Sequence, residues 1–425
     1  MTVQTTSDRP SKLAGYDFYR QILGSPKLIV APMVDQSELA WRILSRRYGA
    51  QLCYTPMINA KMFSPPSANS YRAQAFNTSL QEEGSTTHDR PLIVQFCANN
   101  PSQLLTSALA VQDHCDAIDI NLGCPQDIAR KGHYGSFLMD EWELVYELIN
   151  ILHLNLSIPV TAKFRIFPSI EKTVAYAKML ESAGAQILTC HGRLRTQRGQ
   201  NTGLADWAHI KAVKEAVGVP VFANGNILFY EDVLRCMEET GVDGVMSAEG
   251  QLYNPALFAP APCQDPGSTL KGAHPPHAEL ALEYLDIVKS LKTPTATSAV
   301  KGHLFKIMRP ALSREIDLRE RLGRIRGSNV VEEYIEVAKE MKERMERDVA
   351  EAMEGGKTID DLITIEPTTG IRVLPHWLSQ PYFRPLKSPT DDLKRGSSPI
   401  PISHEDVKRP KLSVESAGGE IGVPL

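Results

Sequence analysis

The sequence lacks paired cysteines: none of its seven stands in a C-x-x-C pair. They are scattered, at positions 53, 97, 115, 124, 190, 236 and 263. An odd, scattered set argues against a disulfide framework and against a cysteine-based zinc site, and it favours a reducing compartment. We therefore expect no bound metal. The chain also has no run of 18 uninterrupted apolar residues, so we expect no membrane-spanning helix and no membrane partner.

Strong charge of one sign is also missing. The formal net charge is only −4 over 425 residues, so any surface that binds nucleic acid must be local. Residues 1–12 are polar and have no apolar core, so we expect no secretory signal. Together these features predict a soluble protein of the cytoplasm, the nucleus or both.

An alternation of short apolar runs and longer helical stretches begins at Leu28. The candidate strands are 28–31, 51–54, 92–96, 117–121, 160–164, 186–190, 221–223 and 244–247. Amphipathic stretches such as 170–182 and 207–216 lie between them. Eight such units predict the α/β class and a (β/α)8 TIM barrel. A doubly wound sheet is less favoured because no G-x-G-x-x-G follows the first strand.

Composition divides the chain into five parts. We predict a flexible N-terminal arm, a catalytic barrel, a linker rich in proline, glycine and serine, a C-terminal helical domain and an extension that is disordered beyond about residue 384. These parts are 1–24, 25–258, 259–276, 277–353 and 354–425. Two basic clusters in the extension, 394–395 and 408–411, match a bipartite nuclear address, a weak pattern.

Within the helical part, the segment 301–326 carries eight Lys or Arg against three acidic residues. A run of charge is usually a solvated face. Next to a barrel with basic loops it also suits the phosphate backbone of a nucleic acid.

The stretch from Asp119 to Asp127 organises the prediction of a site. An apolar run ends in Asn121, and Gly123-Cys124-Pro125 forms a turn directly after it. Barrel enzymes place their chemistry beyond the ends of their strands, so the Cys124 thiol is a candidate reactive group. A buried cysteine beside a turn is the alternative.

Polar residues also follow the other candidate strands, and in a barrel they would share one mouth. The set comprises Pro32, Met33, Gln95, Asn121, Lys163, Arg165, His191, Arg193, Asn224, Gly225, Asn226, Ala248 and Glu249. Small residues after the last two strands expose backbone N–H groups that suit a phosphate. An apolar wall at Pro32 and Met33, with Gln95 at a ring edge, suits a flavin, and Lys163 suits the negative charge of its reduced ring.

The same motifs, in this order, resemble the tRNA-dihydrouridine synthases. They are Ala31-Pro32-Met33, Asn121-Leu122-Gly123-Cys124-Pro125, Thr161-Ala162-Lys163-Phe164-Arg165, His191-Gly192-Arg193 and Ala223-Asn224-Gly225-Asn226-Ile227. The resemblance runs from about Leu28 to about Met308. The strings 31–38, 54–57 and 132–135 are similar to the eukaryotic, fungal-like branch that acts on positions 16 and 17 of the D-loop.

This resemblance implies an FMN-dependent reduction of tRNA uridine to 5,6-dihydrouridine, with NADPH as reductant. Hydride would reach C6, and Cys124, protonated at neutral pH with an ordinary thiol pKa of about 8.5, would supply the proton to C5. The implied cofactor residues are Pro32, Met33, Val34, Gln95, Lys163, His191, Asn224, Gly225, Asn226, Ala248 and Glu249. The expected RNA contacts are Asn121, Arg165, Arg193, Arg195, Arg198, Lys301, Lys306, Arg324 and Arg326. We expect a monomer with tRNA as partner.

Two alternatives remain open at this point. One is a flavin-dependent ene-reductase that acts on a free small molecule or pyrimidine, which would not need the basic helical segment. The other is an RNA-binding protein that keeps the barrel as a scaffold. Such a protein would have lost Cys124 or the phosphate loops, and both are present.

Overall fold

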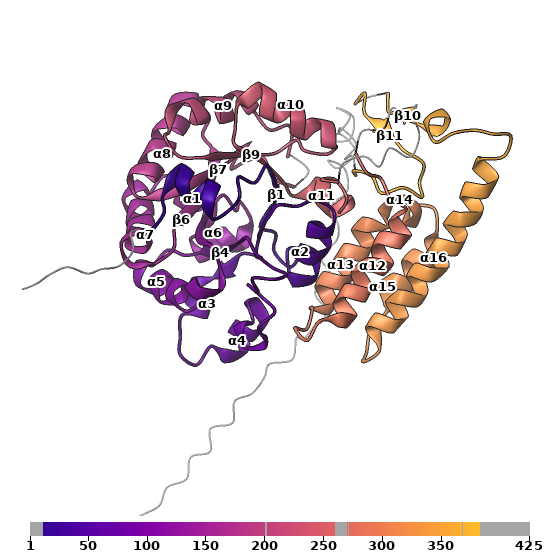
Figure 1. The fold of residues 1–425 in the computed structure, drawn as a ribbon, viewed down its shortest axis with the longest axis horizontal. Helices are drawn as coiled ribbons and strands as arrows, with labels where there is room; N and C mark the ends of the chain where they lie inside the picture. Colours follow the sequence, from indigo (N-terminus) through magenta and orange to yellow (C-terminus); the bar gives the residue numbers. More distant parts are fainter. Residues whose placement is uncertain (1–11, 200–201, 260–269, 271, 368, 383–425) are drawn as a thin grey trace, which may run out of the picture. The chain divides into compact units, whose positions relative to one another are not determined.

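The computed structural model describes residues 12–199, 202–259, 270, 272–367 and 369–382 (Figure 1). Within these residues, eight parallel strands close into a barrel, because β1 pairs with both β2 and β9 and β2 also pairs with β4. The strands are β1 (Leu28–Val30), β2 (Leu52–Tyr54), β4 (Leu92–Cys97), β5 (Ala117–Leu122), β6 (Val160–Ile166), β7 (Ala185–Leu194), β8 (Val221–Asn224) and β9 (Gly244–Ser247). The predicted barrel is confirmed.

Helices cover the outside of the barrel, so strands such as β4 are buried on both faces. The main ones are α2 (Leu39–Arg47), α5 (Pro101–Leu109), α7 (Trp142–Asn155), α8 (Ile170–Ser182), α9 (Trp207–Ala216) and α10 (Tyr230–Thr240). Local chemistry sets their ends. The Ser169 hydroxyl accepts a hydrogen bond from Lys172 N at 3.1 Å at the start of α8, and Gly241 ends α10 with φ of +68°.

Several short elements were not predicted from the sequence. They are α1 (Gly15–Gln21), β3 (Ile58–Asn59), α3 (Ala60–Phe63), α4 (Asn69–Ala75), α6 (Asp127–Gly132) and α11 (Glu249–Tyr253). In α1, Phe18 and Tyr19 are buried, and the Tyr19 hydroxyl donates to Asp243 O at 2.9 Å. The prediction of a flexible arm is therefore wrong for this helix, which closes the barrel end where the strands begin. Residues 1–11 lie outside the described part.

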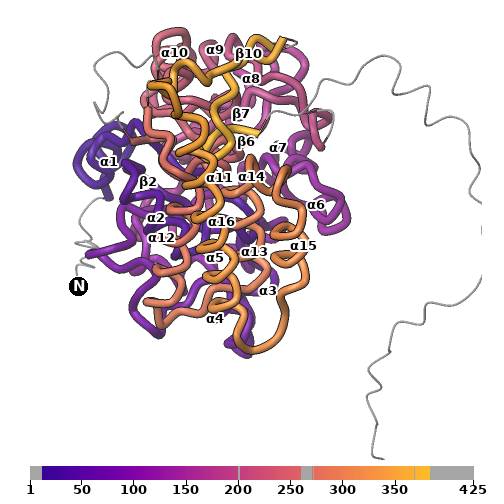
Figure 2. The backbone as a smooth tube through the Cα atoms, turned by 90° about the vertical axis from the view of Figure 1, so that its right-hand side faces the viewer, coloured from indigo at the N-terminus to yellow at the C-terminus, as the bar shows by residue number. Residues whose placement is uncertain are grey.

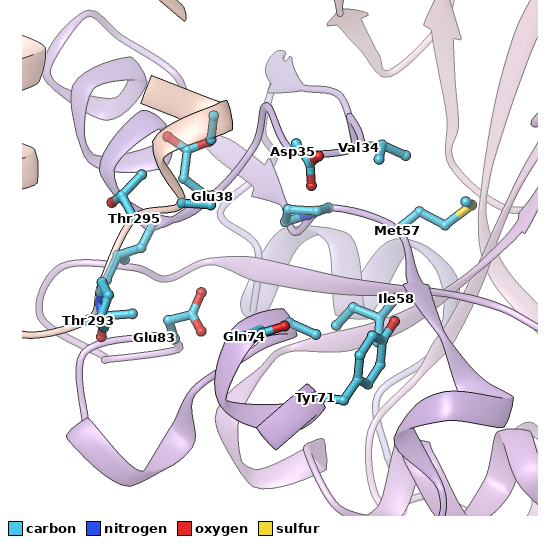
Figure 3. A pocket seen from close by; sticks show the side chains of 16 residues that line it. Val34, Asp35, Glu38, Met57, Ile58, Tyr71, Gln74, Glu83, Thr293 and Thr295 are labelled. Atoms are coloured by element: carbon cyan, nitrogen blue, oxygen red, sulfur yellow. The ribbon is translucent and has the colours of Figure 1, made fainter. Parts of the chain in front are cut away.

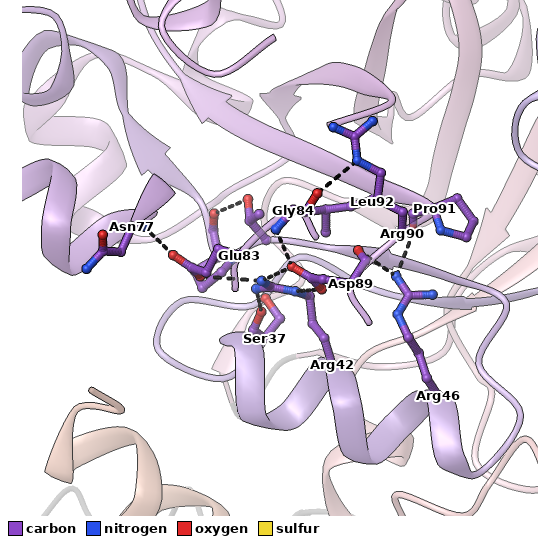
Figure 4. A network of polar contacts seen from close by, with 12 residues as sticks. Ser37, Arg42, Arg46, Asn77, Glu83, Gly84, Asp89, Arg90, Pro91 and Leu92 are labelled. Atoms are coloured by element: carbon purple, nitrogen blue, oxygen red, sulfur yellow. Dashed lines mark hydrogen bonds and ion pairs between the residues drawn. The ribbon is translucent and has the colours of Figure 1, made fainter. Parts of the chain in front are cut away.

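A buried ion network ties α2 to the segment before β4 (Figure 4). The Arg42 guanidinium donates to the Asp89 carboxylate through Nε at 2.7 Å and through Nη2 at 2.6 Å. Its Nη2 also lies 3.3 Å from Glu83 Oε1. Asp89 also accepts from Gly84 N at 2.8 Å. Arg42 and Asp89 are fully buried, so their charges depend on each other for compensation.

The predicted helical domain is present and contains α12 (His277–Ser290), α13 (Thr297–Ile307), α14 (Arg309–Leu312), α15 (Ile316–Arg324) and α16 (Val330–Ala352). The sequence pattern predicted α12, α13 and α16, but not α14 or α15. Figure 2 shows these helices in front of the barrel in the turned view, and α12 packs against α2.

Polar contacts lock this domain onto α2. Glu38 accepts hydrogen bonds from the Tyr284 hydroxyl at 2.7 Å and pairs with His303 Nε2 at 3.0 Å. The His303 ring stacks on Trp41 with centroids 3.9 Å apart.

Residues 354–382 return to the barrel and the helical domain. They contain a small hairpin of β10 (Thr364–Ile365) and β11 (Arg372–Val373), and Trp377 and Leu378 are buried. Arg372 pairs with Glu231 of α10 at 2.5 Å. The described structure thus continues beyond the expected end of the helical domain at 353, into the predicted extension. Most of the linker prediction (260–269 and 271) and the predicted tail, with its two basic clusters, lie outside the described residues.

No helix in the described ranges is long and apolar enough to cross a membrane.

Candidate active site at the barrel mouth

The turn after β5 holds Cys124 from two sides. Asn121 Oδ1 accepts hydrogen bonds from Gly123 N at 3.2 Å and Cys124 N at 2.9 Å. Ser136 donates to Cys124 O through both its backbone N–H and its hydroxyl, at 3.1 and 3.0 Å. A side chain at Gly135 would clash with Cys124 O, since a Cβ there would lie 2.8 Å away. The backbone of Cys124 is therefore fixed in position.

The environment keeps this thiol protonated. Cys124 is only partly exposed, and burial raises its pKa above the ordinary value, despite opposing contributions from Gln126 N–H, Arg165 and Lys163. At neutral pH the Cys124 thiol thus carries a proton.

Lys163 lies on β6 with its ammonium group at the barrel mouth. Its Nζ donates to Asn224 Oδ1 at 2.9 Å, and Asn224 in turn donates to Met246 O at 2.9 Å. Burial, and then repulsion from Arg165, lower the pKa of Lys163 to about 8. The structure therefore joins the predicted residues of strands β6 and β8.

His191 and Arg193 form a second pair at this mouth. The Arg193 guanidinium lies 2.9 Å from His191 Nε2, and because arginine can only donate, Nε2 is the acceptor and carries no proton. Burial, with repulsion from Lys163, Arg165 and Arg193, holds the pKa of His191 well below its usual value. His191 is therefore neutral and cannot serve as a cationic contact. Arg193 also donates to Asn226 Oδ1 at 3.2 Å.

Arg165 is buried and braces the loop that carries the thiol. Its guanidinium donates to Gly123 O at 2.8 Å, to Leu194 O at 2.9 Å and to Gln197 O at 3.0 Å. Two arginines of the loop after β7 also brace it: Arg195 donates to Ser136 O at 3.1 Å, and Arg198 donates to Pro125 O at 2.9 Å. The structure thus shows a bracing role for all three; their RNA contacts stay a prediction.

The four basic residues predicted in the helical domain fall into two groups. Lys301 donates to Gly323 O at 2.9 Å and Lys306 to Gln36 Oε1 at 2.6 Å, so both lysines support the fold. Arg324 and Arg326 are exposed, and Arg324 pairs with Glu320 at 2.8 Å. The two arginines are therefore the better placed to meet an RNA backbone.

Sequence reasoning missed one member of the site, Asp119. This carboxylate lies in the barrel interior, where it accepts from Gln95 Nε2 at 2.8 Å and from Thr161 Oγ1 at 2.7 Å. Burial raises its pKa to about 6, so it is ionised at neutral pH. The available signal was a charged residue inside an otherwise apolar strand.

A separate cavity of about 220 Å³ lies between the barrel loops after β1 and β2 and the loop joining α12 to α13 (Figure 3). Its walls include Val34 and Met57 as apolar residues and Asp35, Glu38 and Glu83 as acidic ones. Val34, predicted to contact the cofactor, lines this cavity, which does not include Cys124 or Lys163.

The strand-end residues fit an anionic cofactor. Arg165 lowers the pKa of Lys163, and Arg193 lowers the pKa of Arg165, so positive charge accumulates at this mouth. A bound phosphate or an electron-rich ring would relieve this repulsion. No group of three or more His, Cys, Asp or Glu side chains within the described ranges is arranged to hold a metal ion.

Residues 29–353 match the model of the family described as dihydrouridine synthase (Dus). The chain belongs to the dihydrouridine synthase family. It is 46% identical over 413 residues to the tRNA-dihydrouridine(16/17) synthase [NAD(P)(+)] of Saccharomyces cerevisiae, covering 96% of this chain and 95% of that protein. It is 46% identical over 386 residues to the Schizosaccharomyces pombe protein of the same name, covering 89% and 92%. A Mus musculus relative, tRNA-dihydrouridine(16/17) synthase [NAD(P)(+)]-like, is 49% identical over 374 residues, covering 88% and 72%.

Proposed function

We propose that this protein reduces uridines 16 and 17 of the tRNA D-loop to 5,6-dihydrouridine, with FMN as cofactor and NADPH as reductant. The observation that carries the proposal is the Cys124 turn, held by Asn121 and Ser136 beside a cationic barrel mouth in a member of this family. The names of the relatives supply the two positions and the NAD(P) dependence.

Bound FMN would supply the hydride to C6 of the uracil ring, and the remaining work falls to the chain. The Cys124 thiol donates its proton to C5. The thiolate left behind is stabilised by Arg165, Lys163 and the Gln126 N–H, each of which lowers the Cys124 pKa. The hydrogen bonds of the surrounding loop hold the Cys124 backbone, so the proton is delivered from a constrained turn.

Positive charge and backbone amides would hold the cofactor. We assign its binding to the predicted set, with Lys163 as a cation for it and Asn224 as the residue that orients Lys163. Neutral His191 can offer a hydrogen bond without adding charge to the crowded cations. The other residues of the set are Pro32, Met33, Gln95, Gly225, Asn226, Ala248 and Glu249, whereas Val34 lines the separate cavity.

Lys163→Met is expected to weaken FMN binding by about 10- to 100-fold, since a charged hydrogen-bond donor is lost. In the unmodified protein, affinity should fall between pH 7 and pH 9.5, because Lys163, with a pKa of about 8, loses its charge over this range. Quenching of flavin fluorescence measures both effects. Unchanged affinity in the variant, or the same pH dependence as the parent, would remove Lys163 from the cofactor site.

Reversing the charge of Arg324 and Arg326 together is expected to weaken tRNA binding and to reduce its dependence on salt. The slope of log affinity against log salt concentration should fall by about one unit for each lost phosphate contact. Both side chains are exposed, so the fold should be kept. Filter binding at several salt concentrations measures the slope. The matched control is Lys178→Glu with Lys211→Glu, the same charge change on exposed positions of α8 and α9. Equal losses in the two proteins would place the footprint elsewhere.

The test of the proposed function is a map of dihydrouridine, position by position. Purified protein with FMN and NADPH is incubated with an unmodified tRNA, and tRNA from cells lacking the protein is mapped in parallel. Product at 16 and 17 in the first experiment, and its loss there in the second, supports the proposal. Product at other positions would keep the reaction and overturn the position assignment. No product with tRNA, but turnover of a free pyrimidine, would favour the small-molecule ene-reductase.

A further inference from the structure

We propose that Asp119 is a positioning residue that sets the orientation of two amide side chains, Gln95 and Asn121, and through them holds Cys124 in place. Its effect on turnover rests on the proposed function. Its effect on the thiol does not.

The register of the barrel places the three side chains in one interior network. Asp119 and Asn121 are two residues apart on β5, so they project to the same face of the strand. Gln95 of β4 is paired with Asp119 in the ladder, and Thr161 of β6 pairs with Asp119 on the other side. Gln95, Asp119 and Thr161 are almost fully buried, so water does not compete for their hydrogen bonds.

The hydrogen bonds run in one direction. An ionised carboxylate only accepts, so Gln95 must turn its Nε2 toward Asp119, which it reaches at 2.8 Å. Gln95 Oε1 then faces Asn121 and accepts from Asn121 Nδ2 at 2.8 Å. Asn121 Oδ1 is left facing the turn, where it accepts from the N–H groups of Gly123 and Cys124.

The opposite orientation of either amide would bring like groups together. With Gln95 reversed, its oxygen would face the Asp119 carboxylate and its NH₂ would face the Asn121 NH₂. With Asn121 reversed, its NH₂ would face the N–H groups of Gly123 and Cys124. The Asp119 carboxylate at one end of this chain and the N–H groups of the turn at the other therefore select the same orientation of both amides.

A carboxylate is a costly residue for the interior of a barrel unless it is fully hydrogen-bonded. Asp119 meets that condition with Gln95 and Thr161, and its charge also raises the pKa of Lys163, which favours the charged ammonium at the mouth. Filling the barrel would need only an apolar side chain. The Asp119 carboxylate differs from an apolar side chain because it accepts hydrogen bonds without donating any, and this orients the Gln95 amide.

The first experiment compares Asp119→Leu, which keeps the shape but removes both acceptors, with the matched control Thr161→Val, which removes only the hydrogen bond on the far side of Asp119. Asp119→Leu is expected to lower kcat on tRNA by about 100-fold through misplacement of the thiol, with KM for tRNA changed less than about twofold. Alkylation of Cys124 by iodoacetamide, followed on its peptide by mass spectrometry without tRNA, should become at least about fivefold faster as the turn loosens. Thr161→Val leaves the Asp119 carboxylate as the acceptor for Gln95, so it should change both quantities much less than Asp119→Leu does.

A second set keeps the test valid if Asp119→Leu does not fold. Asp119→Asn can still accept from Gln95 if its NH₂ donates to the Thr161 hydroxyl, so this single variant should stay near the parent. The double variant Asp119→Asn with Thr161→Val removes that partner, and the amide can then turn either way. We expect a loss of kcat in the double variant that exceeds the combined losses of the two singles.

The proposal is overturned if Asp119→Leu matches Thr161→Val in kcat and in alkylation rate, or if the double variant is only additive. It is also overturned if kcat falls in parallel with Tm in every variant while the alkylation rate stays constant, because that is a purely structural role. Failure of the parent protein to reduce tRNA would instead overturn the proposed function, and the alkylation rates would still decide the role of Asp119.

Discussion

Cys124→Ala is expected to reduce dihydrouridine formation in tRNA by about 10²- to 10⁴-fold, the usual contribution of a positioned general acid. The structure shows why three nearby polar groups cannot take its place. Lys163 is needed as a cation, His191 is neutral and hydrogen-bonded to Arg193, and Asp119 is ionised at neutral pH. Single-turnover reduction of tRNA, with the flavin absorbance recorded at the same time, measures the loss.

Binding should be retained in this variant. The hydrogen bonds that hold the turn come from the backbone of Cys124 and survive removal of the sulfur. Affinity for tRNA and flavin content are therefore expected to match the parent within about twofold, since neither depends on the thiol. The matched control is Cys97→Ala, a buried thiol in the adjacent cluster, which should keep most of the turnover. Normal reduction by Cys124→Ala, or equal loss in the Cys97 variant, would contradict the assignment.

Asp89→Ala is expected to lower the free energy of unfolding by about 3–5 kcal/mol, because it leaves the buried Arg42 guanidinium without its main counter-charge. Arg42 donates twice to Asp89, and the remaining carboxylate, Glu83, lies farther away at 3.3 Å (Figure 4). Asp89 also accepts from Gly84 N, so the backbone before β4 loses a partner as well. Urea denaturation followed by circular dichroism measures the change.

A surface ion pair provides the comparison for this effect. Asp317 pairs with Arg344 at 2.6 Å, but its side chain is 63% exposed. Asp317→Ala is expected to lower the free energy of unfolding much less, as for other exposed pairs. A similar loss in both variants would mean that burial adds nothing to the Arg42–Asp89 interaction. Unchanged stability of Asp89→Ala would show that Glu83 alone compensates Arg42.

The amino-acid sequence by itself determined the barrel and the centre of the site. Alternating apolar runs and amphipathic stretches fix strands and helices through local periodicity, so the eight predicted strands all appear in the structure. Since the carboxyl ends of barrel strands share one mouth, the strand assignments also predicted that Cys124, Lys163 and His191 would meet. The short helix α1 escaped this reasoning because it is only seven residues long and the barrel end that it covers is formed by distant segments.

Only the tertiary structure decided what each polar residue does. The sequence predicted phosphate contacts for Arg165, Arg195 and Arg198, because the hydrogen-bond partners of an arginine on a loop cannot be identified from sequence alone. In the fold, carbonyl groups from other loops accept their hydrogen bonds. Asp119 was a single charge in an apolar strand until the ladder placed Gln95 and Thr161 on either side of it. Charge, orientation and burial depend on contacts between residues far apart in the chain, and such contacts exist only once the barrel has closed.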